Sequence, residues 1–113
     1  MRILLSVVAL GSTLTIAQAE TRIFVDGNKL HNFCLSHPLS ASGYIIGVAD
    51  QQLIAEDMNL GQGSKFKFCL PEGAQGGQLV DTVCQYLKNN PQIRHLSGAI
   101  LVTGSLSEAF PCR

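Results

Sequence analysis

The sequence predicts an all-α fold, a small four-helix bundle stapled by two disulfides. Apolar residues recur at helical spacing in four segments, the four cysteines form an even set, and the N-terminus resembles an export signal. Together these features indicate one helical domain that folds in an oxidising compartment. The 113-residue chain has no internal repeat and no low-complexity tract.

The first nineteen residues are typical of a signal peptide. Arg2 supplies the positive start, residues 3–17 are mostly apolar, and Ala17-Gln18-Ala19 fits the small-x-small cleavage pattern. We therefore expect residues 1–19 to be a signal peptide cleaved after Ala19 and residues 20–113 to form the helical domain. The apolar stretch is short for a bilayer span, which needs about 20 apolar residues. The expected location is the periplasm.

A first helix is expected at 26–35. Asp26 can accept hydrogen bonds from the first free backbone N–H groups, and Leu30, Phe33 and Cys34 share one face. Residues 36–38 should end it, because proline cannot continue a helical hydrogen-bond ladder. Residues 39–42 then form a polar connector.

A second helix is expected at 42–56, with Ser42 as its N-cap. Its apolar stripe consists of Ile45, Ile46, Ala49, Leu53 and Ile54. Gly43 and Gly47 lie four residues apart and so share a face. A glycine costs about 1 kcal/mol inside a helix, and the simplest reason to keep Gly47 is the close approach of another helix.

The third helix organises the chain. The amphipathic spacing of its apolar residues predicts one buried face (Leu79, Val80, Val83, Cys84, Tyr86 and Leu87). Residues 75–77 contain no good capping residue, so we expect the first turn to fray, whereas Pro91 ends the helix. The preceding connection, 57–67, is polar and rich in glycine and is expected to be an exposed loop.

A fourth helix is expected at about 98–109, with Ser97 as its cap. Its expected buried stripe consists of Ala99, Val102, Leu106, Ala109 and Phe110. Gly104 and the β-branched Val102 and Thr103 lower its intrinsic helix propensity, so packing must hold it.

Four cysteines allow three disulfide connectivities. Short loops make successive helices antiparallel neighbours, which places the end of the first helix near the end of the third and the start of the third near the end of the fourth. We therefore predict Cys34–Cys84 and Cys69–Cys112. Each could add about 3–4 kcal/mol of stability by restricting the unfolded chain.

No credible active site, metal site or cofactor site emerges from the residues, so we do not expect an enzyme. His31, Cys34 and His37 have a spacing that could bind zinc, but a disulfide would remove the Cys34 thiolate. A pair of His95 with Cys69 or Cys84 would need a free thiol, which an exported protein with an even cysteine count does not favour. The carboxylates Asp50, Glu56 and Asp57 fit a solvated helix face.

Acidic and basic residues balance at eight each, which gives no reason to expect nucleic acid or an anionic membrane as a partner.

Several short motifs, taken in order, carry a resemblance to a known family. They are GYIIGVAD at 43–50, FCLP at 68–71, QLVDTVCQYL at 78–87, NP at 90–91, HL at 95–96 and AFPC at 109–112. The chain resembles the Rap/Tai family of type VI secretion immunity proteins over about residues 30–112. One position departs from the family pattern. A cysteine usually stands two residues before the GYI motif, where this chain has Ala41, and an additional cysteine occurs at Cys84. The departure puts the family's disulfide pattern in doubt for this chain.

The resemblance implies an all-helical periplasmic protein that binds a papain-like peptidoglycan amidase toxin and occludes its active-site cleft. Dimers occur in the family, so a homodimer is an open alternative. The contact surface would be a polar connection between helices, first 57–67 and second 88–95. The residues expected to bind the partner are Gln62, Ser64, Lys65, Asn89 and Arg94.

An HdeA-like periplasmic acid-stress chaperone, or another periplasmic protein-binding module, is the alternative function. Such chaperones are also small, helical and disulfide-bonded. A chaperone of this kind should expose apolar surface as the pH falls, and the carboxylates and three histidines could drive that change. The identity of the toxin and the oligomeric state stay open.

Overall fold

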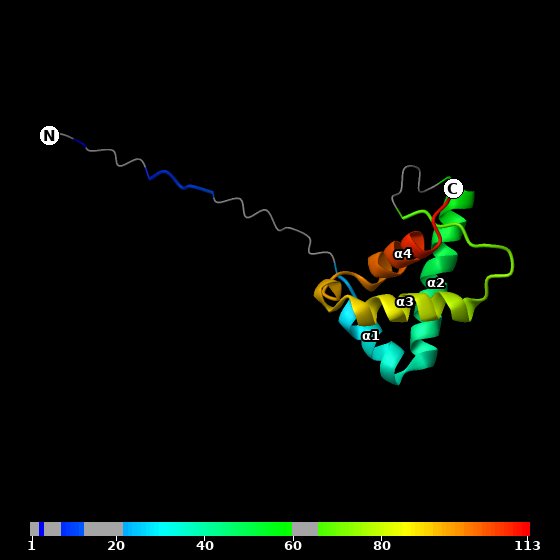
Figure 1. Cartoon of the computed structure of the whole chain (residues 1–113). Helices are drawn as coiled ribbons and strands as arrows, with labels where there is room; N and C mark the ends of the chain where they lie inside the picture. Colours follow the sequence, from blue (N-terminus) through cyan, green and yellow to red (C-terminus); the bar gives the residue numbers. More distant parts are fainter. Residues whose placement is uncertain (1–2, 4–7, 13–21, 60–65) are drawn as a thin grey trace.

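The computed structural model describes residues 3, 8–12, 22–59 and 66–113, and the described part contains four α-helices, one 3-10 turn and no β-sheet. The helices are α1 (Gly27–Ser36), α2 (Pro38–Asp57), α3 (Gly76–Asn89) and α4 (Gly98–Ala109), with the 3-10 turn η1 (Pro91–Ile93) between α3 and α4. Figure 1 shows α2 crossing α3 steeply, with α1 and α4 on either side of α3. The predicted all-α four-helix fold is confirmed.

One apolar core lies where the four helices meet. Every helix contributes to it, and so does one residue of the connection before α3: the buried apolar side chains are Leu30, Ala41, Ile45, Ala49, Phe68, Leu79, Val83, Leu87, Leu101, Val102 and Leu106. Phe68 is 1% exposed although it lies outside any helix. Its neighbour Cys69 donates its backbone N–H to the carbonyl of Phe110 at 2.9 Å, which fixes this connection against the end of α4.

Both predicted disulfides are present. Cys34 at the end of α1 is bonded to Cys84 on α3, with Cα atoms 5.8 Å apart. Cys69 is bonded to Cys112, with Cα atoms 4.9 Å apart. The predicted pairing, one of three possible, is therefore confirmed.

The start of α2 was predicted wrongly. The expected connector at 39–42 is helical, and the helix begins at Pro38 instead of after a Ser42 cap. Proline is well suited to the first helical position, because its fixed φ matches the helix and its missing N–H has no partner there. The residue that ended α1 in the prediction thus begins α2.

The start of α3 also differs from the expectation that it would fray. The Gln78 side chain accepts a hydrogen bond from the backbone N–H of Gln75 at 2.8 Å, so a residue inside the first turn supplies the cap. In α4, Ser97 occupies the N-cap position as predicted, but its side chain makes no capping hydrogen bond. Ala109, expected in the buried stripe of α4, is exposed, while Leu101 is buried.

Gly43 and Gly47 do not mark a close contact between helices. A Cβ added at either position would meet no heavy atom within 4 Å outside its own turns of helix, and both residues are exposed. The close contact occurs at Gly27 instead. A Cβ there would lie 2.7 Å from both the Cα and the carbonyl oxygen of Arg94.

Candidate partner-binding surface

The residues expected to bind a partner fall into two groups. Gln62, Ser64 and Lys65 lie outside the described residues, so their role stays a prediction. Asn89 and Arg94 are described. Asn89 is the last residue of α3, and Arg94 directly follows η1. Their surroundings differ sharply.

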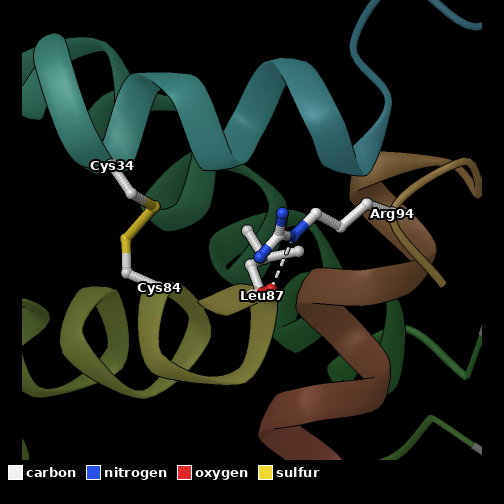
Figure 2. The surroundings of a disulfide bond; sticks show 4 residues. All are labelled: Cys34, Cys84, Leu87 and Arg94. Carbon is white, nitrogen blue, oxygen red and sulfur yellow. Dashed lines mark hydrogen bonds between the residues drawn. A yellow bond between two sulfur atoms is a disulfide. The ribbon is translucent and has the colours of Figure 1, made fainter. Parts of the chain in front are cut away.

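Arg94 is engaged within the domain. Its Nε donates to the carbonyl oxygen of Leu87 at 2.7 Å, and its Nη2 donates to that of Lys88 at 3.2 Å. Figure 2 shows the guanidinium turned toward the end of α3, in the space between α3 and α1. The last carbonyls of a helix have no partner within it, so this side chain caps α3 and places a positive charge at the negative end of the helix dipole.

Asn89 is the last residue of α3 and is exposed. It lies on a shallow hollow of about 460 Å³ between α3 and α4, lined by Thr82, Gln85, Tyr86, Asn89, Asn90, Ser105, Glu108 and Ala109. Much of the hydrogen-bonding capacity of this hollow is used internally. Thr82 donates to the carbonyl of Gln78, Ser105 to that of Val102, and Gln85 to the Asn89 side chain.

A second hollow, of about 430 Å³, lies between α1 and α3 beside the Cys34–Cys84 disulfide. His31, Asp81 and Lys88 contribute its titratable groups. The Nδ1 atom of His31 is buried and has no hydrogen-bond partner among the described residues. Burial lowers the pKa of His31, and the positive charge of Arg94 lowers it further, because both disfavour the imidazolium form.

This hollow is a poor metal site. Cys34 and Cys84 are oxidised, so neither offers a thiolate. Across the described ranges, no group of three His, Cys, Asp or Glu side chains is placed to hold a metal ion. His31, Cys34 and His37 therefore do not come together as ligands.

A third hollow is a groove of about 560 Å³ between α2 and α4. Its lining is uncharged: Gly43, Tyr44, Gly47, Val48, Gln51, Gln52, Ala99, Ile100 and Thr103. Burial raises the pKa of the Tyr44 hydroxyl, while the backbone N–H of Ala99 acts in the opposite direction. The hydroxyl lies so close to α4 that a Cβ at Gly98 would be 3.0 Å from it. Tyr44 thus packs against the first turn of α4 and forms part of the wall of the groove.

Sequence reasoning missed this groove. The signal for it was present in α2, whose apolar residues extend almost all the way around the helix and whose two interior glycines share one face. A helix that is apolar on all sides is normally buried on all sides. Here one of those sides is open.

The profile of the Rap1a immunity proteins matches residues 26–112, which is most of the chain and all four helices. The chain belongs to this family. A search of curated proteins found no similar sequence. The matched residues of this chain include both disulfides, the α2–α4 groove and the Asn89 hollow.

Membership in an immunity-protein family implies that the partner is a cognate effector protein. None of the helices described in this Rap1a family member is both long and apolar enough to cross a bilayer. The predicted signal peptide falls mostly on residues outside the described ranges, so it stays a prediction.

Proposed function

We propose that this protein is a periplasmic immunity protein that binds a papain-like peptidoglycan amidase, delivered by a type VI secretion system, and occludes its active site. The match to the Rap1a immunity family over residues 26–112 carries the proposal. The finer identification of the amidase rests on the sequence motifs that resemble the Rap/Tai group. The two disulfides support a compartment outside the cytoplasm, because disulfides persist where thiols are not kept reduced.

In this proposal the toxin supplies the catalytic cysteine and histidine, and this chain supplies a rigid body that blocks access to them. The cross-links are suited to that role, because a preorganised binding surface loses less conformational entropy on association. The connections 57–67 and 88–95 are the proposed contacts with the cleft. A homodimer is an open part of the proposal, and sedimentation of the oxidised mature chain would measure it.

A protection assay tests the proposal. A papain-like peptidoglycan amidase, ideally one encoded beside this chain, would be directed to the periplasm of a test bacterium, and lysis would be followed with and without the full chain. We expect protection and a tight complex. The matched control lacks residues 1–19, so that the chain stays in the cytoplasm, away from the toxin, and should give no protection.

The complex itself would then be measured with purified proteins. Gln62, Ser64 and Lys65 would be replaced together by alanine, and we expect weaker toxin binding with an unchanged melting temperature. Unchanged affinity would show that 57–67 is not the contact. If the wild-type chain gives neither protection nor a complex while folded and oxidised, suppression of client aggregation at low pH would test the chaperone alternative.

A further inference from the structure

We infer that the groove between α2 and α4 is a docking site for an uncharged, apolar segment of the effector, flanked by an acidic group. The inference rests on the proposed function for the existence of an effector partner and adds the surface that binds it. None of the residues that line the groove belongs to the connections 57–67 and 88–95, so the groove would hold the body of the effector while a connection reaches the active site.

Gly43 and Gly47 both line the groove. Interior helix glycines lower stability relative to alanine, and a close contact inside the domain would have been a reason to keep them. That reason is absent, because a Cβ at either position would have open space around it. Because these two lining positions carry no side chain, a side chain of the effector can reach the backbone of α2 at the floor of the groove.

The lining of the groove is uncharged and partly apolar. None of the nine lining residues is charged, and Val48, Ala99 and Ile100 supply apolar surface. Ile100 is 49% exposed on the rim. Gln51, Gln52 and Thr103 add uncharged groups that can bond a peptide backbone, which is how most specific apolar sites fix the orientation of what they bind.

A positive charge beside the groove favours an acidic group on the occupant. The groove continues into a neighbouring hollow of about 370 Å³, which shares Tyr44 and Ile100 with it and is also lined by Arg22, Ile23, Phe24, Val25 and Ser97. Arg22 is the single charged residue among the described residues that line the two hollows. A segment that fills the apolar part would therefore gain from a carboxylate at the Arg22 end, since a guanidinium binds carboxylates well.

The other two hollows fit an effector less well. The hollow at Asn89 has several of its polar groups bonded within the domain. The hollow at His31 is bounded by the Cys34–Cys84 disulfide, Asp81 and Lys88 and so offers mixed charges and little apolar area. Buried apolar contacts at the centre of an interface usually supply most of the binding free energy, which favours the α2–α4 groove.

The test measures, by calorimetry, the affinity of the full mature, oxidised chain for the purified amidase used in the protection assay. Gly47→Leu fills the groove and should raise the Kd by at least about tenfold. Gly77→Leu is the matched control. It also lies in a helix with no heavy atom within 4 Å of an added Cβ, but on α3, and it should change the Kd by less than about twofold.

A second pair of variants keeps the test informative if Gly47→Leu does not fold. Ile100→Glu places a charge on the rim and should weaken binding by about tenfold or more. Its control is Ile54→Glu, which changes an isoleucine of similar exposure, 53%, outside the groove. Arg22→Glu should raise the Kd by a smaller factor, about three- to tenfold, and reduce its dependence on salt.

The outcomes separate the inference from the proposed function. If the wild-type chain does not bind the amidase, the proposed function fails, and the inference fails with it. If the wild-type chain binds and Gly47→Leu and Ile100→Glu bind equally well, the inference alone is overturned. A change in sedimentation from dimer to monomer with unchanged amidase affinity would assign the groove to a second copy of the chain and would also overturn it.

Discussion

The side of the domain where α1 meets α3 and the side where α2 meets α4 use their small residues in opposite ways. On the first, the cross-linked side, Gly27 lets the start of α1 approach the backbone of Arg94, and the Cys34–Cys84 disulfide joins α1 to α3. On the second, the groove side, Gly43 and Gly47 face open space. Gly27 therefore allows a close contact within the domain, whereas Gly43 and Gly47 leave part of the surface of α2 uncovered.

The two sides therefore contribute differently to the stability of the domain. On the cross-linked side, the Cys34–Cys84 disulfide, the close packing at Gly27 and the capping of α3 by Arg94 stabilise the domain. The groove side gives up some helix stability and exposes apolar area instead. The unfolding free energies of variants from both sides would test that contrast.

The largest effect should come from removing the Cys34–Cys84 disulfide. The double variant Cys34→Ala/Cys84→Ala should lose about 3–4 kcal/mol of unfolding free energy, because the unfolded chain gains the freedom of a 50-residue loop. Urea unfolding under oxidising conditions would measure it. A loss below about 1 kcal/mol would mean that packing alone holds α1 against α3.

Crowding at Gly27 should produce the next largest effect. Gly27→Ala should cost about 2–3 kcal/mol, because the new methyl group would overlap the backbone of Arg94, which cannot move as a flexible side chain can. Urea unfolding of this variant beside Gly77→Ala, where the added methyl group has open space, gives the comparison. Equal stability of the two variants would contradict the close contact.

Loss of the arginine cap on α3 should cost less. Arg94→Met keeps much of the apolar stem but removes the hydrogen bonds to the carbonyls of Leu87 and Lys88, so we expect a loss of about 1–2 kcal/mol. Arg94→Lys should restore only part of it, because an ammonium cannot reproduce the fork geometry of a guanidinium. Full rescue by lysine in thermal unfolding would show that charge, not the paired geometry, stabilises the helix end.

The groove side should respond with the opposite sign. Gly43→Ala and Gly47→Ala should each stabilise the domain by about 0.5–1 kcal/mol, because alanine favours the helix and meets no obstacle. Chemical unfolding of each single variant would measure this gain. Destabilisation at either position would mean that the glycines serve the fold, and the contrast between the two sides would be lost.

The pH dependence of stability should show the smallest effect, at His31. Its pKa is lowered in the folded state, so the unfolded chain binds the proton more readily, and stability should fall as the pH drops below the unfolded value of about 6.5 toward the folded pKa. His31→Gln should remove that part of the slope between about pH 7 and 5. The exposed His95→Gln is the control, and an equally large change in that variant would contradict the assignment to His31.

Much of the fold was predictable because its determinants are local. The apolar spacing of residues 79–87 predicted α3, Asp26 predicted the cap of α1 and accepts the backbone N–H of Lys29 at 2.8 Å, and short connections predicted both disulfide pairs. Where two local signals competed, the prediction failed. Pro38 was interpreted as the end of one helix, although it is equally suited to begin the next.

The candidate site was less predictable, because a surface depends on what packs nearby. Asn89 and Arg94 were chosen as polar residues of one connection, yet Arg94 turns inward to cap α3 while Asn89 stays exposed. The chain carries no local signal for this difference. It follows from the position of α1 and the carbonyls of Leu87 and Lys88, which only the folded chain brings beside Arg94.

The sequence by itself determined the helical class, the number of helices, the disulfide pairing and the resemblance to an immunity family, because periodicity, turn residues and ordered motifs are properties of neighbours along the chain. Only the tertiary structure decided that Gly27 is crowded while Gly43 and Gly47 are open. A glycine has the same propensity in all three places. Whether another element occupies the space left by its missing side chain depends on how the helices cross, and that is a property of the packed domain.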